Sequence, residues 1–227
     1  VKNKNGMALV SVGGQNNTFL PTSSTNYTTL GKNIAKFLKD NNFDGLDLDL
    51  EQIPSTITSD NIVTMLDSLR LEFKKDSNID VIITGAPEVA GGYGGPASLG
   101  SNGSVWTQDF LQKANFDVLF IQEYNQNGGA VFDGKQDTDV GFITASFKPL
   151  ADFIPQNTKI VIGEPATFDA GSGLSDPNQI IQDITSDNTE TSMMNSDRFA
   201  GLMTWSINYD ANNQWQWVDT IKSLFNT

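Results

Sequence analysis

Short apolar segments alternate with amphipathic segments along the whole chain. Apolar and β-branched runs that are bounded by turn residues predict strands. The six predicted strands cover residues 7–14, 45–52, 80–88, 117–125, 159–167 and 199–210. Between them, apolar residues recur at helical spacing. The clearest stripes are Leu30, Ile34, Phe37 and Leu38, and then Ile62, Met65, Leu66, Leu69 and Phe73; shorter helices are predicted near 107–114, 142–153, 179–184 and 215–225.

The regular alternation of strand and helix predicts an α/β fold with a parallel sheet covered by helices. Two architectures fit this pattern, a doubly wound open sheet and a (β/α)8 barrel of the TIM type. Residues 44–51 distinguish them, because they run Asp-Gly-Leu-Asp-Leu-Asp-Leu-Glu. Central strands of an open sheet are apolar on both faces. A strand that alternates Leu with acid fits a barrel instead, where the inner face lines a polar active-site mouth. The sequence therefore predicts a TIM-type barrel.

The same segment places three acids on one face of its strand. Side chains alternate between the two faces of a strand, so Asp47, Asp49 and Glu51 share one face and three leucines share the other. Acids spaced roughly 7 Å apart along a strand repel one another. At least one of them is therefore expected to keep its proton to unusually high pH. This arrangement suits a general acid in a cleft.

The predicted strand ends are evenly spaced. Gly14, Glu51, Glu88 and Asn125 follow one another at intervals of 37 residues. Eight βα units at this spacing would need about 300 residues, which is within the usual size of a TIM barrel, whereas the chain has 227 residues. We therefore expect a single barrel domain over residues 1–227, with the first two βα units absent and the domain truncated at its N-terminus.

Composition narrows the possible chemistry. A net charge of −13 repels phosphate backbones, so no nucleic-acid partner is expected. A segment that crosses a bilayer needs about 20 apolar residues, and no apolar run approaches this length, so no membrane association is expected either. The sequence contains no His and no Cys, which excludes thiolate and imidazole metal sites and His-activated nucleophiles. Acid–base chemistry is therefore left to carboxylates and tyrosines, and no metal or other cofactor is expected.

Polar motifs stand at the end of each predicted strand, where the active site of a barrel is built. In chain order they are Ser11-Val12-Gly13-Gly14, the acidic segment 44–51, Ala86-Pro87-Glu88, Gln122-Glu123-Tyr124-Asn125, Gly163-Glu164-Pro165-Ala166 and Met203-Thr204-Trp205-Ser206-Ile207-Asn208. This ordered set resembles glycoside hydrolase family 18, the chitinases and their relatives. It looks most like the single-domain bacterial chitinases of the chitinase D type, over nearly the whole chain. It differs from them at Tyr209, where relatives of this type usually have Trp.

The resemblance implies a retaining, endo-acting chitinase that hydrolyses β-1,4-linked N-acetylglucosamine polymers by a substrate-assisted mechanism. In that mechanism Glu51 matches the general acid that protonates the glycosidic oxygen, and the substrate's own acetamido oxygen forms an oxazolinium intermediate. Asp49 matches the group that orients the acetamido N–H, and Asp47 matches the buried carboxylate that shares a proton with Asp49. Tyr124 matches the hydroxyl that holds the acetamido oxygen, and Trp205 matches the aromatic floor beneath the sugar.

The resemblance also implies a partner and further contacts. Gln122, Asn125 and Glu88 match positions that bind the sugar or support the groups that do, the partner is chitin or its oligosaccharides, and the protein is expected to be secreted from a bacterium. Two other functions stay open at this point. An endo-β-N-acetylglucosaminidase acting on glycoprotein glycans shares the acidic segment, and a non-catalytic chitin-binding lectin shares the fold, although such lectins commonly lose the terminal Glu. Trp106 is interpreted either as an outer sugar contact or as a loop anchor.

Overall fold

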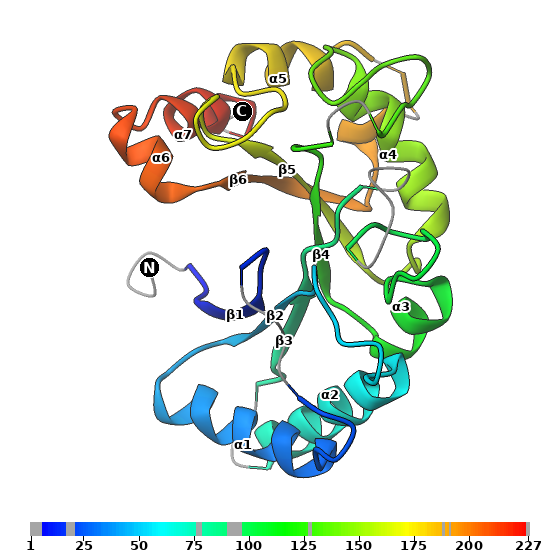
Figure 1. Ribbon diagram of the computed structural model, residues 1–227. Coiled ribbons are helices and arrows are strands. Elements are labelled where there is room, and N and C mark those ends of the chain that lie inside the picture. The colour runs from blue at the N-terminus through cyan, green and yellow to red at the C-terminus, as the bar shows by residue number, and fades with distance from the viewer. Residues whose placement is uncertain are drawn as a thin grey trace. The chain divides into compact units, whose positions relative to one another are not determined.

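The computed structural model describes residues 6–16, 21–75, 79–89, 97–126, 129–187, 189–190 and 192–225. Within them, six strands form a parallel sheet in the order β1-β2-β3-β4-β5-β6, and helices separate successive strands along the chain (Figure 1). A doubly wound sheet reverses its strand order at a switch point. The sequential order therefore excludes the doubly wound alternative and agrees with the predicted barrel. None of the helices in this described part is long and apolar enough to cross a bilayer.

The observed strands match the predicted ones in number and order but are shorter, and the helix Ile207–Asn212 lies where the end of a strand was predicted. The strands are β1 (Leu9–Gly13), β2 (Gly45–Asp49), β3 (Ile82–Gly85), β4 (Val118–Gln122), β5 (Lys159–Pro165) and β6 (Phe199–Trp205). The helices are α1 (Tyr27–Asp40), α2 (Ser59–Lys74), α3 (Gln108–Ala114), α4 (Phe142–Phe153), α5 (Pro177–Ile184), α6 (Ile207–Asn212) and α7 (Gln216–Ile221), and the short 3-10 helices are η2 (Met193–Asn195) and η3 (Lys222–Leu224).

The predicted sixth strand, residues 199–210, is wrong at its C-terminal end. The strand ends at Trp205, and α6 begins two residues later. The reason is a buried carboxylate: Asp210 accepts hydrogen bonds from the backbone N–H groups of Trp217, at 2.8 Å, and Val218, at 3.2 Å. These bonds satisfy amides in the first turn of α7, which would otherwise have no partner within the helix. Asp210 is therefore fixed on a helix that packs beside α7.

The chain divides into two compact units, and each is described by itself. Unit 1 comprises Val1–Pro87 and Gly95–Leu119, and unit 2 comprises Glu88–Gly94 and Phe120–Thr227. The division falls within β4, so unit 1 holds β1 to β3 and unit 2 holds β5 and β6.

In unit 1, α1 packs closely against α2. A side chain at Gly31 of α1 would place its Cβ 2.1 Å from the backbone oxygen of Met65 in α2, so only glycine allows this approach. The buried face of α1 consists of Tyr27, Gly31, Ala35 and Leu38. The predicted stripe is wrong at Phe37, which is 51% exposed and stacks on Phe43 at a centroid distance of 6.2 Å. A buried face on α1 that is narrower than the predicted stripe suffices, because Gly31 brings the backbones of α1 and α2 together.

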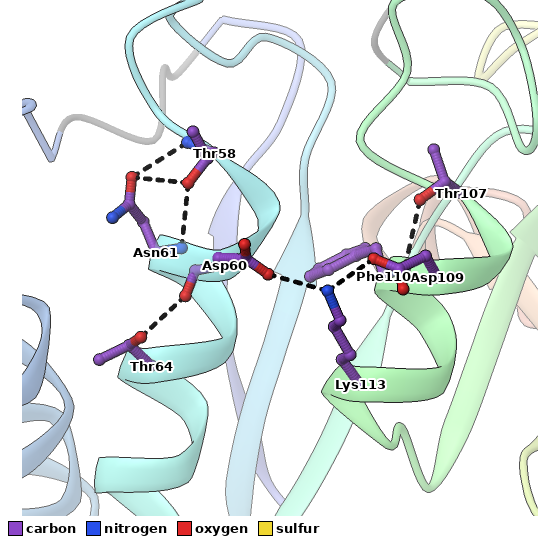
Figure 2. A network of polar contacts seen from close by, with 8 residues as sticks. All are labelled: Thr58, Asp60, Asn61, Thr64, Thr107, Asp109, Phe110 and Lys113. Atoms are coloured by element: carbon purple, nitrogen blue, oxygen red, sulfur yellow. Dashed lines mark hydrogen bonds and ion pairs between the residues drawn. The ribbon is translucent and has the colours of Figure 1, made fainter.

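Side-chain caps fix the first turns of α2 and α3 in unit 1 (Figure 2). Thr58 and Asn61 form a reciprocal capping box at the start of α2, and Thr107 accepts a hydrogen bond from the N–H of Phe110 at the start of α3. Each such cap stabilises a helix by about 1 kcal/mol. Lys113 of α3 also lies 3.1 Å from a carboxylate oxygen of Asp60 in α2. α2 begins at the end of the connection that follows β2, and α3 at the end of the connection that follows β3. These caps therefore hold the C-terminal ends of the two connections in place.

In unit 2, β5 and β6 pair in parallel, with Glu164 opposite Thr204 and Pro165 opposite Trp205. A buried arginine, Arg198, supports the start of both strands. Its N–H groups donate to the backbone oxygens of Ala151, Ile154, Pro155 and Thr158. These carbonyls lie at the end of α4 and in the turn before β5, so Arg198 fixes this connection from within.

Candidate active site

Three acids, Asp47, Asp49 and Glu51, follow one another at alternate positions along and just beyond β2, and we call them the acid ladder. The leucines between them, Leu46, Leu48 and Leu50, are at most 1% exposed, whereas the acids are partly exposed. The predicted alternation is therefore confirmed. The strand ends at Asp49, so Glu51 lies on the connection beyond it, and its backbone N–H donates to the oxygen of Asp49 at 3.1 Å.

Asp47 lies between two hydroxyl groups from the neighbouring strands. Ser11 of β1 donates to one carboxylate oxygen at 2.7 Å, and Thr84 of β3 donates to the other at 2.6 Å. The parallel register brings these side chains together, because Ser11 and Thr84 are the register partners of Asp47 on either side. Both carboxylate oxygens of Asp47 therefore have a hydroxyl donor.

Burial raises the pKa of Asp47 above its usual value, while the hydrogen bonds from Thr84 and Ser11 oppose this rise. The prediction that one acid of the segment would hold its proton to higher pH is therefore confirmed in direction. The predicted cause, repulsion between neighbouring acids, is wrong for Asp47. The cause is the loss of water around a carboxylate that packs between two strands.

A double-glycine turn at the end of β1 contacts the end of β2. Gly13 and Gly14 have positive φ angles of 115° and 86°, a region that side chains other than glycine rarely adopt. A Cβ on Gly13 would lie 1.9 Å from the backbone oxygen of Asp49. The N–H of Gly14 donates to that same oxygen at 2.8 Å. The two glycines thus fix the backbone of Asp49 at the strand end.

Trp106 supports the backbone next to Glu51 from the core of unit 1. Its side chain is fully buried, and its indole N–H donates to the backbone oxygen of Leu50 at 3.3 Å. Its ring packs against Phe110 and Phe116 at centroid distances of 5.7 and 5.6 Å.

The interpretation of Trp106 as an outer sugar contact is therefore wrong, because the side chain is fully buried. Its interpretation as a loop anchor agrees with the structure, since the N–H of Gly100 donates to its backbone oxygen at 3.0 Å and its own backbone N–H donates to the hydroxyl of Ser104 at 3.0 Å. The sequence offered no signal for the contact with Leu50, because that carbonyl is 56 residues away along the chain.

In unit 2, Glu88 and Gln122 meet at the carboxyl end of β4. They form an isolated parallel bridge, and the N–H of Val89 donates to the oxygen of Gln122 at 3.0 Å. Gln122 is 8% exposed and Tyr124 only 5% exposed. The side chains of Gln122 and Tyr124 are therefore held in place by the residues packed around them.

Of Gln122, Tyr124 and Asn125 at the end of β4, Asn125 is the residue with an exposed side chain. It adopts a left-handed backbone with φ of 61° and is fixed by Ser172, whose N–H donates to its side-chain oxygen at 2.9 Å. Gly171 leaves room for this contact, because a Cβ there would lie 2.9 Å from the same oxygen. The side chain of Asn125 thus ties the end of β4 to the connection after β5.

Trp205 ends β6 with an indole that is 52% exposed. The backbone N–H of Ala166, just beyond β5, donates to the oxygen of Trp205 at 2.8 Å. Tyr209, on the helix that follows, is 37% exposed. Unit 2 therefore presents an aromatic surface at the carboxyl ends of β5 and β6.

Two acids of the polar motifs lie in the core of unit 2 and not at its surface. Glu123 and Glu164 are both 0% exposed, and the N–H of Glu123 donates to the oxygen of Gly163, which places the two acids on adjacent strands. We call them the buried acid pair. Burial raises the pKa of both well above the ordinary glutamate value. Strand alternation gives the reason, because Glu123 points away from the face of Gln122 and Tyr124.

The buried acid pair is incompletely hydrogen-bonded. Glu123 accepts from the hydroxyl of Ser146, and Glu164 accepts from the N–H of Leu174 at 3.2 Å. The remaining oxygen of each carboxyl has no hydrogen-bond partner within the described residues. In the same part of the chain, no group of three or more acids is arranged to hold a metal ion.

A family model for glycosyl hydrolases family 18 matches residues 1–167. Exochitinase 1 from Streptomyces olivaceoviridis is 26% identical over 96% of this chain and 43% of its own length. Chitinase Chi52 from Paenibacillus xylanexedens is 28% identical over 91% of this chain and 46% of its own length. The chain thus spans less than half the length of these two relatives.

A solved structure has the same fold. A family GH18 chitinase from Chromobacterium violaceum superposes with a TM-score of 0.74 and 20% identity, over 100% of this chain and 67% of that one. This likeness confirms the predicted barrel fold class. The acid ladder and the motifs at the ends of β1 to β5 lie within the residues that the family model matches. The chain belongs to glycosyl hydrolase family 18.

Proposed function

We propose that this protein is a chitinase, a retaining glycosidase that cleaves β-1,4-linked N-acetylglucosamine polymers within the chain. The observation that carries the proposal is the acid ladder, a row of three partly exposed acids backed by buried leucines within the region that the family model matches. The names of the relatives, which are chitinases, support the same substrate.

In the proposed mechanism Glu51 donates its proton to the oxygen of the scissile glycosidic bond. The acetamido oxygen of the substrate attacks the anomeric carbon as the bond to the leaving sugar breaks, which gives an oxazolinium ion. Water then attacks the same carbon from the opposite side and loses its proton to the Glu51 carboxylate. Two displacements restore the original configuration. The position of Glu51 just beyond the strand end, with its backbone next to the Trp106 contact, supports this role.

Asp49 and Asp47 are proposed to work as a pair. Asp49 accepts the acetamido N–H of the substrate and balances the positive charge that develops on the ring. Asp47 shares a proton with Asp49. The raised pKa of Asp47 supports this division, because two neighbouring acids with unequal pKa values can supply a neutral group and an anion at the same pH. Ser11 and Thr84 hold the Asp47 carboxylate in place.

The remaining roles fall to residues of unit 2. Tyr124 is proposed to donate its hydroxyl proton in a hydrogen bond to the acetamido oxygen, and Trp205 to stack under the sugar at the cleavage point. Gln122, Asn125 and Glu88 are proposed to bind sugar hydroxyls or to hold these groups. The exposed indole of Trp205 supports its role, because a flat apolar surface matches the C–H face of a pyranose. Chitin is an insoluble extracellular polymer, so we also propose that the protein is secreted.

The test is the turnover of chitohexaose by the Glu51→Gln variant, which keeps the shape of the side chain and removes its acidity. Turnover is expected to fall by about two to four orders of magnitude, the usual contribution of a general acid. Glu190→Gln, at an exposed position on the surface, serves as the matched control and should leave turnover unchanged. A Glu51→Gln enzyme with near-normal turnover would overturn the proposal.

The same preparation separates the proposal from its two alternatives. Release of chitobiose from chitin, without release of glycans from a high-mannose glycoprotein, supports a chitinase over an endo-β-N-acetylglucosaminidase. A protein that binds chitin oligosaccharides but forms no product would instead be a lectin.

A further inference from the structure

The connection between β3 and α3 contains an asparagine followed by a glycine, Asn102-Gly103, and both residues are exposed. The roles described above do not use this pair. An asparagine can modify its own chain when the backbone nitrogen of the next residue attacks the side-chain carbonyl carbon and closes a succinimide ring. A glycine in the next position favours this reaction, because it has no Cβ to crowd the attacking nitrogen.

Asn102 and Gly103 are the two central residues of a β-turn. The N–H of Ser104 donates to the backbone oxygen of Ser101 at 3.0 Å, which closes the turn. Gly103 has a φ of 81°, whereas Asn102 is not among the residues with positive φ, and this combination is typical of a type II turn. The N–H of Gly103 has no hydrogen-bond acceptor within the described residues. The nitrogen that attacks is therefore not held by another bond.

The space around the pair is open as well. A Cβ built on Gly103 would meet no atom within 4 Å, so neighbouring residues do not obstruct the ring as it forms. Asn212 of α6 is also exposed, but it is followed by a residue with a side chain, Asn213, whose N–H donates to the oxygen of Tyr209 at 3.0 Å. Two asparagines with the same access to water thus differ in whether the next nitrogen is free to react.

The Asn102-Gly103 turn belongs to a closed loop that anchors Trp106. The N–H of Gly100 donates to the backbone oxygen of Trp106 at 3.0 Å, so residues 100–106 form a ring with the turn inside it. The backbone N–H of Trp106 donates in turn to the hydroxyl of Ser104 at 3.0 Å. A change in the length of the main chain at Asn102 therefore acts on both bonds.

We propose that Asn102 is a site of spontaneous deamidation, and that its isoaspartyl product loosens the loop around Trp106. The Gly103 nitrogen loses its proton to solvent and bonds to the side-chain carbonyl carbon, and the side-chain nitrogen takes up a proton and leaves as ammonia. Water then opens the succinimide. Opening at the former side-chain carbonyl gives aspartate, whereas opening at the main-chain carbonyl gives isoaspartate, in which the main chain runs through the side-chain carbon.

Isoaspartate adds one carbon atom to the main chain inside the loop. The turn between Ser101 and Ser104 then no longer closes at its present length, and the Ser104 hydroxyl moves relative to the N–H of Trp106. The indole of Trp106 donates to the backbone oxygen of Leu50, which precedes Glu51. The effect of the modification is therefore expected to reach the connection that follows β2.

The experiment incubates the folded wild type, Asn102→Gln and the matched control Asn212→Gln in a mildly alkaline buffer, which favours loss of the amide proton. Peptide mapping by mass spectrometry follows the side-chain amide at each asparagine, and a synthetic peptide of residues 98–106 gives the unrestrained rate. Asn102 is expected to lose its amide over the same period as the peptide, while Asn212 keeps its amide. Glutamine would have to close a larger ring, so Asn102→Gln is expected to stay unmodified in the loop.

An Asn102 side chain that keeps its amide while the peptide loses it would overturn the proposal, and so would equal loss at Asn212. Hydrogen exchange over residues 98–106 tests the effect on the loop, because local opening exposes amides to exchange. Aged wild type and aged Asn212→Gln are expected to exchange faster there than fresh protein, and aged Asn102→Gln is expected to match fresh protein. Unchanged exchange after isoaspartate has formed, or faster exchange in aged Asn102→Gln, would overturn the link to the loop. Neither measurement uses turnover, so the result is independent of the proposed function.

Discussion

The two units of this protein contain carboxylates in opposite environments. In unit 1 the acid ladder is partly exposed, and Asp47 receives a hydroxyl hydrogen bond on each of its two oxygens. In unit 2 the buried acid pair, Glu123 and Glu164, has no exposure, and one oxygen of each carboxyl has no partner among the described residues. Burial raises the pKa in both places.

A raised pKa does not by itself identify a catalytic acid. A group that transfers a proton to a substrate must be within hydrogen-bond reach of it. The buried acid pair is shielded from any substrate, whereas the acid ladder stands at a strand end with partial exposure. Perturbed pKa values mark candidate sites only in combination with access, and access here selects the acid ladder.

The largest expected effect is a difference in turnover between a variant of the acid ladder and a variant of the buried acid pair. We expect Glu51→Gln to lower kcat by about two to four orders of magnitude and Glu164→Gln to leave kcat within about twofold, because Glu164 contacts no substrate in the proposed mechanism. Steady-state kinetics on chitohexaose at several pH values would measure both. A loss of turnover in Glu164→Gln without any loss of folded protein would show that the buried acid pair takes part in the reaction.

The second prediction concerns the stability of the buried acid pair against pH. Its pKa values are raised in the folded state, so the folded protein binds more protons than the unfolded one at pH values between the ordinary and the raised pKa. The protonated pair therefore stabilises the folded state fully below the ordinary glutamate pKa, and this stabilisation is lost as the pH rises through the raised pKa values. We expect the Tm of the wild type to fall as the pH rises through this range, and that of Glu164→Gln to fall less.

Thermal unfolding followed by circular dichroism measures this difference. A protein of this size shifts its Tm by roughly 2–4 °C for each kcal/mol of stability. Glu190→Gln is the control, since it removes a carboxyl that is exposed. Parallel curves of Tm against pH for Glu164→Gln and the wild type would show that ionisation of the buried acid pair does not destabilise the folded state.

The third prediction sharpens the role of the hydroxyls around Asp47. Thr84→Val removes a donor that lowers the pKa of Asp47, so the pKa of this acid is expected to rise further. Turnover should fall about tenfold, consistent with the loss of a hydrogen bond to a charged group, and the acidic side of its pH profile should move to higher pH. Thr64→Val, at an exposed position of α2, is the control. An unmoved pH profile would contradict the assignment.

The smallest effect is expected from the support behind Glu51. Trp106→Phe removes the indole N–H that donates to the Leu50 oxygen, a contact of about 1 kcal/mol. We expect kcat to fall severalfold with KM almost unchanged, because the acid would be held less firmly while sugar contacts persist. Phe110→Leu trims the same aromatic cluster without touching that carbonyl. If both variants lose the same activity, packing alone explains the effect.

The order of strands and helices, and the two faces of β2, could be predicted from the sequence because they depend on local periodicity. Leu46, Leu48 and Leu50 alternate with the acids at a spacing of two residues, and any extended backbone separates them. The ordered motifs likewise indicated the family, since residue types and their spacing are properties of the chain alone. These features required no knowledge of which distant segments meet.

Burial and hydrogen-bond partners could not be predicted in this way, because they depend on contacts between residues far apart in the chain. Trp106 lies in the core and Phe37 at the surface, although both are aromatic residues in or next to helices. Glu164 and Asp47 both belong to polar strand-end motifs. The packing of neighbouring strands leaves one oxygen of Glu164 without a hydrogen-bond partner among the described residues, whereas it gives Asp47 two hydroxyl donors. The positions of the acids along the strands follow from residue order alone, whereas packing between distant segments sets which of these acids water can reach.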